Sequence, residues 1–185
     1  TETPFTEDIT AHYPAPVSPI GLSKYLNERA VTFMAYQYKK TFTIWRMFNV
    51  VSPLEDHTRP GAHVFVDFYR TLFVEQAKTL SIFGDGKQKR CFTWVEDVAD
   101  TLIRFLEDDR TNGQTFNLGG DEPITLIELK DRLMTIGKKA GLLPADYEPE
   151  ILSGQTFFGT EAAVRIPSLA QITRVLGCRP STNVD

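Results

Sequence analysis

The sequence predicts an α/β protein in which mostly parallel strands alternate with helices. Segments rich in β-branched and aromatic residues, at 42–51 and 80–83, alternate with segments whose apolar residues recur at helical spacing, at 62–78 and 125–140. Capping patterns that mark helix starts lie between them. A chain that alternates strands and helices in this way favours a parallel sheet connected by helices.

The composition is typical of a soluble globular domain. The 185 residues are 42% hydrophobic and 24% charged, with a formal net charge of -4 and a pI near 5.4. Because phosphate-backbone binding usually needs a broad basic face, this charge argues against a nucleic-acid partner. No apolar run approaches the ~20 residues of a membrane span, so we expect no membrane association and a cytoplasmic location. Cys91 and Cys178 lie far apart without metal-type neighbours, which predicts reduced thiols and no metal site.

The first 53 residues are expected to contain one long helix and one strand. Ser18 and Pro19 form a helix-start signal, because Ser suits the N-cap and Pro has its φ already set for the first helical position. One stripe of this helix carries Leu22, Leu26, Ala30, Phe33 and Gln37. Residues 42–51 are apolar on both alternating faces, as in a strand buried within a parallel sheet. Pro53 ends that strand.

Residues 83–98 combine a turn, a basic loop and a helix start. Gly84 and Gly86 follow an apolar run and predict a turn that needs positive φ. Three cations follow within four residues, at Lys87, Lys89 and Arg90. From the spacing alone, a solvated hairpin loop and an anion-binding loop are about equally favoured.

Two capping boxes are predicted, at Thr93-x-x-Glu96 and Thr125-x-x-Glu128. In such a box the hydroxyl and the carboxylate each bind a backbone amide at the start of a helix. Gly141 is the expected end of the second helix. The remaining elements are a short strand at 115–118, a possible strand at 147–152, and a last helix capped by Ser168 that ends at Gly177.

Four segments carry motifs in order and at matching intervals. They are residues 18–24 (SPIGLSK), 46–53 (RMFNVVSP), 84–97 (GDGKQKRCFTWVED) and 117–119 (NLG). They resemble the SPYxxSK, RxxNxxGP, GDGxxxRDFxxVxD and NxG motifs in the C-terminal half of extended short-chain dehydrogenases/reductases. That family contains NAD-dependent nucleotide-sugar epimerases, dehydratases and decarboxylases. Within it, residues 86–93 and 153–167 are most similar to the branch of UDP-glucuronate decarboxylase and UDP-apiose/xylose synthase.

The resemblance implies the C-terminal part of a Rossmann-like fold with a small substrate-binding α/β subdomain. Residues 1–53 would supply a helix and a strand of the sheet. Residues 54–185 would be mainly the substrate-binding region, with strand 114–119 returning to the sheet. The implied cofactor is NAD, the implied substrate is a nucleotide sugar, and the full-length form is expected to be a homodimer.

The glycine-rich fingerprint that seats a dinucleotide on a helix N-terminus occurs nowhere in these residues. In the family it lies in a preceding half, which this chain would complement as a partner. We therefore expect this chain alone not to bind NAD tightly.

The resemblance assigns roles to five residues. Lys24 matches the lysine that binds the nicotinamide ribose and lowers the pKa of a catalytic tyrosine. The backbone of Phe48 lies where the family contacts nicotinamide. Asn49, Arg90 and Arg165 match residues that bind the nucleotide sugar, and Arg90 would face the diphosphate or a substrate carboxylate. Lys24 and Arg90 are thus the catalytic candidates, and Arg90 is expected to point inward while Lys87 and Lys89 stay solvated.

Simpler readings of three of these residues stay open. Lys24 alone could be a surface lysine of a helix. An Asn such as Asn49 at the end of a strand is more often a turn-former. Arg165 could pair with Glu161, although exposed ion pairs are worth only ~1 kcal/mol or less.

Position 20 departs from the family pattern, because Ile20 stands where the family has its catalytic tyrosine. An isoleucine cannot transfer a proton. Two functions follow. The first is NAD-dependent epimerisation, dehydration or oxidative decarboxylation of a nucleotide sugar, with this chain as the substrate-binding half. The alternative is a catalytically impaired member that acts as a nucleotide-sugar binding or interaction protein. The retained Lys24 and Arg90 favour the first, and Ile20 favours the second.

Overall fold

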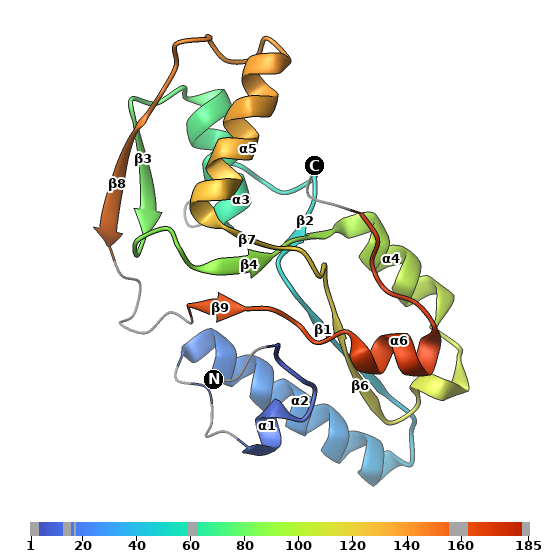
Figure 1. The fold of residues 1–185 in the computed structure, drawn as a ribbon. Coiled ribbons are helices and arrows are strands. Elements are labelled where there is room, and N and C mark those ends of the chain that lie inside the picture. Colours follow the sequence, from blue (N-terminus) through green and yellow to red (C-terminus); the bar gives the residue numbers. More distant parts are fainter. Residues whose placement is uncertain (1–3, 13–15, 17, 59–62, 156–162, 183–185) are drawn as a thin grey trace.

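The computed structural model describes residues 4–12, 16, 18–58, 63–155 and 163–182. Its elements form a lower and an upper group (Figure 1). The lower group contains α1 (Ile9–His12), α2 (Pro19–Tyr38), β1 (Thr43–Met47), β6 (Gln114–Leu118) and α6 (Ala170–Leu176). The upper group contains α3 (Val64–Tyr69), the π-helical turn η1 (Arg70–Val74), β3 (Thr79–Phe83), α5 (Leu126–Lys139) and β8 (Glu150–Gln155). The α/β class is confirmed.

The other elements lie between or beside these groups. They are β2 (Val50–Val51), β4 (Lys89–Cys91), β5 (Thr93–Trp94), α4 (Val95–Arg104), the 3-10 helix η2 (Asp109–Thr111), β7 (Pro123–Thr125) and β9 (Val164–Arg165). Most strand pairs are parallel, namely β1 with β6, β2 with β5, β3 with β8 and β4 with β9. The exception is the antiparallel pair of β4 with β7.

The single strand expected over 42–51 is wrong, because the chain breaks at Asn49. This residue has a φ of 37°, in the left-handed region that Asn tolerates better than most residues. On the two sides of this break, β1 pairs with β6 and β2 pairs with β5. Burial is also incomplete, since most of β1 is half-buried and Met47 is exposed.

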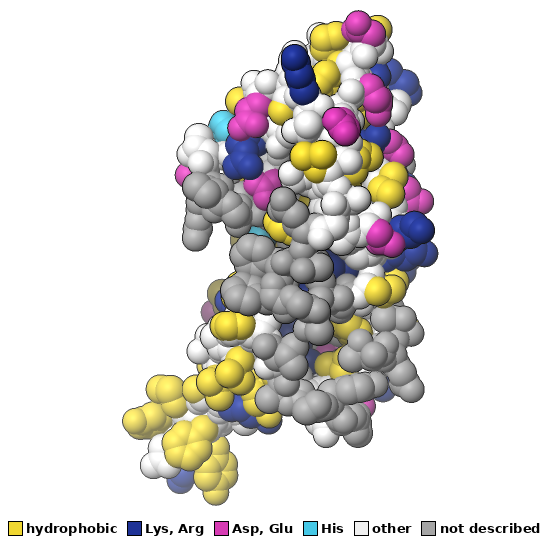
Figure 2. All heavy atoms as spheres, turned by 90° about the vertical axis from the view of Figure 1, so that its left-hand side faces the viewer, with side chains coloured by type: hydrophobic (Ala, Val, Ile, Leu, Met, Phe, Trp, Pro, Cys, Tyr) yellow, Lys and Arg dark blue, Asp and Glu magenta, His cyan; other side chains and the backbone are white. Residues whose placement is uncertain are grey.

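Helix α2 begins where the sequence predicts. The Ser18 side chain accepts a hydrogen bond from the amide of Gly21 at 3.1 Å, and Pro19 occupies the first turn. The helix packs little of its surface against the described chain, and Ala35 is its one fully buried residue. Its exposed apolar side chains are Ile20, Leu22, Leu26, Val31, Phe33, Met34, Tyr36 and Tyr38. Figure 2 shows hydrophobic side chains gathered at the lower end of one face, level with the C-terminal half of α2 in Figure 1.

One capping box is confirmed and the other is wrong. At the start of α5 the Thr125 hydroxyl accepts from the amide of Glu128, whose carboxylate accepts from the amide of Thr125. At the start of α4 the N-cap is Trp94, without a side-chain cap. The hydroxyl of Thr93 is occupied elsewhere, because it donates to the carbonyl of Phe48 at 2.6 Å and accepts from the amide of Gly120 at 3.0 Å.

Two other helix ends differ from the sequence expectation. The helix expected over 62–78 ends at Val74, because the chain turns at Gln76 with a φ of 44° before β3 begins. Helix α6 has Leu169 as its N-cap, and the Ser168 side chain accepts only a long contact of 3.4 Å from the amide of Ala170. Gly177 ends α6 in the left-handed conformation, as expected. The strand expected at 147–152 is found slightly later, as β8.

Gly119 and Gly120 let three segments approach closely beside Thr93. A Cβ on Gly120 would lie 2.3 Å from the backbone oxygen of Phe92, and one on Gly119 would lie 2.9 Å from the Cβ of Phe48. Both distances are too short for a side chain at these positions. The glycines therefore fix the carboxyl ends of β1 and β6 against the segment that leads to α4.

The N-terminal and C-terminal segments meet at Asn117, which is 1% exposed. Its side-chain amide donates to the carbonyls of Phe5 at 2.8 Å and Ser168 at 3.3 Å, and its backbone amide donates to the carboxylate of Glu7 at 2.9 Å. Phe5 also forms a parallel bridge with Pro167. Asn117 thus joins β6 to both ends of the described chain.

Two apolar cores lie on either side of the central strands. The upper core is built from α3, β3 and α5 around Phe68, Leu72, Leu80, Ile82 and Leu129. The lower core is built from α4, β6 and α6 around Val98, Phe116, Leu118 and Ile172. No helix among the described residues is both long enough and apolar enough to cross a membrane.

Candidate functional site

A pocket of about 220 Å³ lies where β2, α3, β3, β4 and β9 converge. Its walls carry two kinds of side chain. The apolar walls include Phe65, Phe68, Ile82, Phe83, Phe92 and Leu126. The polar side chains are Asn49, His63, Asp67, Ser81, Gln88, Arg90 and Arg165. Three of the five residues singled out from the sequence, Asn49, Arg90 and Arg165, thus line one pocket.

Arg90 enters the pocket from β4. It is 5% exposed, whereas Lys87 and Lys89 are exposed, so the three cations of the basic loop divide as expected. The division follows from strand geometry, because successive side chains point to opposite faces. One guanidinium nitrogen donates to the backbone oxygen of Lys89 at 2.8 Å.

Arg165 lies beside Arg90, because β9 pairs with β4 in a register that sets these two residues opposite each other. Residues that face each other on neighbouring strands project from the same side of the sheet. Arg165 is exposed, so the pair has one buried and one exposed member. Glu161, the alternative partner considered for Arg165, lies outside the described residues.

Asn49 reaches the pocket from the break between β1 and β2. Its side-chain amide donates to the carbonyl of Cys91 at 2.7 Å, and its own carbonyl accepts from the amide of Thr93 at 3.1 Å. Asn49 therefore acts as the turn-former that its sequence position suggested. The same bonds tie it to the strand that carries Arg90.

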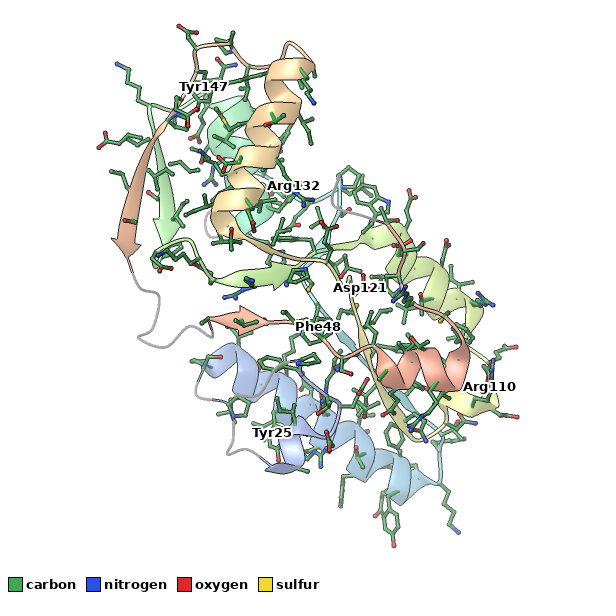
Figure 3. All side chains as sticks on the ribbon, in the orientation of Figure 1. Tyr25, Phe48, Arg110, Asp121, Arg132 and Tyr147 are labelled. Atoms are coloured by element: carbon green, nitrogen blue, oxygen red, sulfur yellow. The ribbon has the colours of Figure 1, made fainter. Side chains whose placement is uncertain are left out.

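Lys24 and Phe48 are not among the residues that line this pocket. Lys24 is exposed on α2, and Ile20 on the same helix is 74% exposed. Phe48 lies near the middle of the molecule, above α2 with its labelled Tyr25 (Figure 3). Its backbone amide donates to the carbonyl of Leu118 at 2.9 Å. The cofactor roles given to Lys24 and Phe48 stay predictions.

Two acidic groups lie at the α3 side of the pocket. The Asp67 carboxylate forms an ion pair with Arg70 at 2.9 Å, yet burial raises the pKa of Asp67 above its usual range. The Arg70 charge opposes this rise, and the negative charge of Glu55 adds to it. Glu55 itself contacts the ring of His63 at 2.7 Å. The described residues contain no cluster of His, Cys, Asp and Glu that could hold a metal ion.

Sequence reasoning missed His63, Asp67 and Gln88. His63 and Asp67 carry no motif, and their place in the pocket depends on how α3 packs. Gln88 could have been found, because it lies two residues before Arg90 in an extended segment and so shares its face. In the sequence, the charges of the neighbouring Lys87, Lys89 and Arg90 are a stronger signal than this neutral amide.

Comparison with known proteins identifies the family. Residues 1–119 match the model of the NAD dependent epimerase/dehydratase family. The chain belongs to this family. The resemblance seen in the four sequence motifs is thereby confirmed.

The names of three curated relatives of this chain refer to UDP-linked sugars. The chain is 32% identical over 134 residues to an uncharacterized UDP-glucose epimerase of Bacillus subtilis (strain 168), covering 69% of this chain and 39% of that protein. It is 33% identical over 145 residues to a UDP-glucuronate 4-epimerase of Thermodesulfobacterium geofontis (strain OPF15), covering 74% and 40%. It is 27% identical over 176 residues to UDP-D-apiose/UDP-D-xylose synthase 2 of Arabidopsis thaliana, covering 88% and 44%. The chain thus spans less than half the length of these relatives.

Solved structures show the same fold. The UDP-glucose 4-epimerase of Thermotoga maritima, solved with UDP-glucose, superposes with a TM-score of 0.79 at 25% identity. The match covers 100% of this chain and 54% of that one. A UDP-glucuronic acid 4-epimerase of Bacillus cereus, solved with UDP-glucuronic acid and NAD, gives a TM-score of 0.75 at 24% identity, covering 92% and 50%. This second likeness concerns the fold alone.

Proposed function

We propose that this chain is the substrate-binding half of an NAD-dependent enzyme that modifies a UDP-linked sugar by epimerisation, dehydration or oxidative decarboxylation. One observation carries the proposal: Asn49, Arg90 and Arg165 line a single pocket, with Arg90 buried in it. Family membership and the names of the relatives support the general reaction and the substrate class.

The pocket suits a nucleotide diphosphate. A guanidinium offers forked donors that bind two phosphate oxygens at once, and such charge-assisted bonds are the strong ones. In a protein with a net charge of -4, an anionic ligand needs a few cations held in place. Arg90 and Arg165, side by side on β4 and β9, meet this need. The apolar walls formed by Ile82, Phe83 and Leu126 would hold the less polar part of the ligand.

NAD would supply the oxidant in the full-length enzyme. In open parallel sheets, ligands bind at the carboxyl ends of the strands. Phe48 and Gly119 lie at the carboxyl ends of the parallel pair β1 and β6, so this edge fits a cofactor site. Lys24, on α2 with its side chain exposed, is our candidate for the cofactor ribose. The partnership with an N-terminal half and the homodimer stay predictions.

A second function is favoured by Ile20. Where the family has a proton-transferring tyrosine, this chain has an apolar side chain. A protein that binds a nucleotide sugar without turning it over would keep Arg90 and tolerate Ile20. Binding of the nucleotide is common to both functions, so it is the first property to measure.

Titration of UDP into the wild-type protein, Arg90→Ala and Lys87→Ala at one salt concentration tests the proposal. Bonds from a charged donor are worth roughly 1.5 to 3 kcal/mol, so Arg90→Ala should weaken binding by about one to two orders of magnitude. Lys87→Ala should change it little, because Lys87 is exposed outside the pocket lining. Arg90→Lys keeps the positive charge but removes the forked donors of the guanidinium. Its affinity for UDP should therefore lie between those of Arg90→Ala and the wild type.

Equal losses at Lys87 and Arg90 would point to a diffuse basic patch and would contradict the proposal. Absence of measurable UDP binding by the folded wild type would also contradict it. Arg165→Ala provides a second test if Arg90→Ala does not fold, since Arg165 is exposed and can be removed with little effect on packing.

A further inference from the structure

Asp67 brings a negative charge into a pocket whose arginines suit an anion. Its side chain is 29% exposed, so a ligand in the pocket can reach it. It lines the same pocket as Arg90 and Arg165. With His63 neutral, the described residues that line the pocket have a net charge of +1 when Asp67 is ionised and +2 when it is protonated, because two guanidinium groups face one carboxyl.

A nucleotide sugar matches the more positive of these two states. Each phosphate group of its diphosphate carries one negative charge, because the diphosphate is esterified at both ends. Repulsion between such a ligand and an ionised Asp67 is stronger in a partly buried pocket than in water. A protonated carboxyl removes this repulsion and offers an O–H donor to a ligand oxygen. The pocket therefore favours the ligand more strongly when Asp67 is neutral.

The surroundings of Asp67 shift its equilibrium towards the protonated form. Burial is the largest effect on its pKa and raises it, and the negative charge of Glu55 also raises it. The positive charges of Arg70 and His63 lower the pKa. Arg70 pairs with Asp67 at 2.9 Å and also contacts the carboxylate of Glu75 at 3.4 Å. Arg70 therefore keeps a partner when Asp67 is protonated.

Helix α5 packs against α3, the helix that carries Asp67. Charged side chains of α5 form ion pairs outside the pocket, namely Lys130 with Asp131 and Glu148, Lys138 with Glu148, and Arg132 with Glu122. From β4 and β9, the charged side chains that line the pocket are Arg90 and Arg165. The charges that act on the pKa of Asp67 in the free protein are thus those of Arg70, Glu55 and His63.

We propose that Asp67 takes up a proton from solvent when a nucleotide sugar binds in this pocket, so that the affinity for the ligand increases as pH falls. This inference rests on the function proposed above. The bound diphosphate adds negative charge beside Asp67 and displaces water, and both effects raise the pKa of a carboxyl. By linkage, an acid that binds its proton more tightly in the complex makes the complex more stable at lower pH.

UDP-glucose is the ligand for the test. UDP itself ends in a phosphate whose second pKa is about 6, so its own charge changes with pH, whereas the doubly esterified diphosphate of UDP-glucose keeps its charge. Calorimetry from about pH 5 to about pH 8, in two buffers of different ionisation enthalpy, gives both the affinity and the number of protons taken up. The affinity of the wild type should rise about 3- to 10-fold as pH falls, because a shift of one pKa unit corresponds to a tenfold change in binding.

Three variants identify the group that takes up the proton. Asp67→Asn imitates the protonated carboxyl, so it should bind UDP-glucose near pH 8 as tightly as the wild type does near pH 5, without proton uptake. Arg70→Gln removes a charge that lowers the pKa of Asp67, so the pH dependence should move to higher pH. His63→Gln should retain proton uptake, although a protonated imidazole in the pocket would also attract an anion.

The proposal is overturned if the wild type binds UDP-glucose without proton uptake over this interval, a result that does not depend on the folding of any variant. It is also overturned if Asp67→Asn takes up protons as the wild type does, or if His63→Gln alone abolishes the uptake. Proton uptake would then belong to another group.

Asp131→Asn is the matched control. Asp131 also forms an ion pair with a basic neighbour, Lys130, at 2.8 Å, but it lies outside the pocket. Its substitution should leave proton uptake unchanged, and an equal loss in Asp131→Asn and Asp67→Asn would contradict a role specific to the pocket. If the folded wild type does not bind UDP-glucose, the proposed function fails. If UDP-glucose binds and depends on Arg90 but no proton is taken up, only the present inference fails.

Discussion

The guanidinium of Arg46 forms two parallel hydrogen bonds with the carboxylate of Glu28, each 2.8 Å long. Arg46 lies on β1 and Glu28 on α2, and the two side chains are 16% and 15% exposed. A further guanidinium nitrogen donates to the backbone oxygen of Glu7 at 2.7 Å. One arginine therefore holds together the N-terminal segment, the long helix and the first strand.

Removal of this pair should destabilise the fold. We expect Glu28→Ala to lower the free energy of unfolding by roughly 2 to 3 kcal/mol, because Arg46 loses two charge-assisted bonds in a largely buried place. Arg179→Ala is the control, since Arg179 pairs with Asp121 at the surface and should cost ~1 kcal/mol or less. Urea denaturation of both variants measures the difference, and equal losses would contradict a structural role for the Arg46 pair.

The hydroxyl of Thr93 should matter more than its methyl group. Thr93→Val keeps the shape but leaves the Phe48 carbonyl and the Gly120 amide without their partner, so we expect a loss of about 2 to 3 kcal/mol. Thr93→Ser keeps both bonds and loses one buried methyl, for which ~1 kcal/mol is expected. Thermal unfolding ranks the two variants, and a larger loss in Thr93→Ser would refute the hydrogen-bonding role.

Alkaline pH should weaken the fold through Cys91. Burial, with smaller contributions from the nearby carboxylates of Asp121 and Glu122, raises the pKa of this thiol from 9.0 to about 11. Between these values the thiol ionises in the unfolded chain but not in the folded protein. The contribution of the buried, protonated thiol to the free energy of unfolding is therefore complete below pH 9 and is lost as pH rises towards 11. Cys91→Ala should therefore lose less stability than the wild type over this interval, measured by denaturation at both ends.

Cys178→Ala is the comparison for this pH effect. Burial also raises the pKa of Cys178, but the positive charges of Arg104 and Arg110 oppose the rise. Its removal should flatten the pH dependence less than removal of Cys91. An unchanged slope in Cys91→Ala would show that other groups, such as the Tyr147 phenol with its raised pKa, cause the loss.

Restoring a phenol at position 20 should raise catalysis. Positions 20 and 24 lie one turn apart on the same face of α2, where Lys24 would stabilise a phenolate. In a form of the protein that binds NAD, Ile20→Tyr should raise NADH formation from a UDP-sugar by ~100- to 10,000-fold, the usual contribution of a general acid/base. Leu22→Tyr on a different face should give no gain. No gain from Ile20→Tyr despite bound NAD would argue against the role of this position.

Local signals in the sequence predicted the elements well where the decisive contacts are local. The Ser18–Pro19 helix start and the Thr125 capping box need only neighbours within one turn, and both form. Thr93 has the same local pattern, but its hydroxyl binds groups on two other segments. A capping pattern cannot show whether a distant carbonyl competes for the hydroxyl. The break at Asn49 was missed for a similar reason, since Asn permits a left-handed conformation without requiring it.

The candidate site was predictable only through the family motifs. Asn49, Arg90 and Arg165 belong to three separate strands or strand ends, and spacing alone gives no reason for them to meet. The register of β4 with β9 brings the two arginines together. The exposure of the apolar side chains of α2 was not predictable from the sequence. Apolar periodicity predicts a helix face that is suited to burial, but it does not indicate which segment or chain packs on that face.

The bonds of Asn117 also affect how the protein folds. The side-chain hydrogen bonds of Asn117 form only when the segments around Phe5 and Ser168 both reach β6. These two segments lie nearly the whole chain apart in the sequence. Ordering so long a loop costs entropy before any contact compensates for it, and chains rich in distant contacts fold slowly. The bonds of Asn117 to Phe5 and Ser168 are therefore expected to form late in folding, after contacts between residues closer in the sequence, and the segment around Phe5 is expected to be the last part to gain protection from hydrogen exchange.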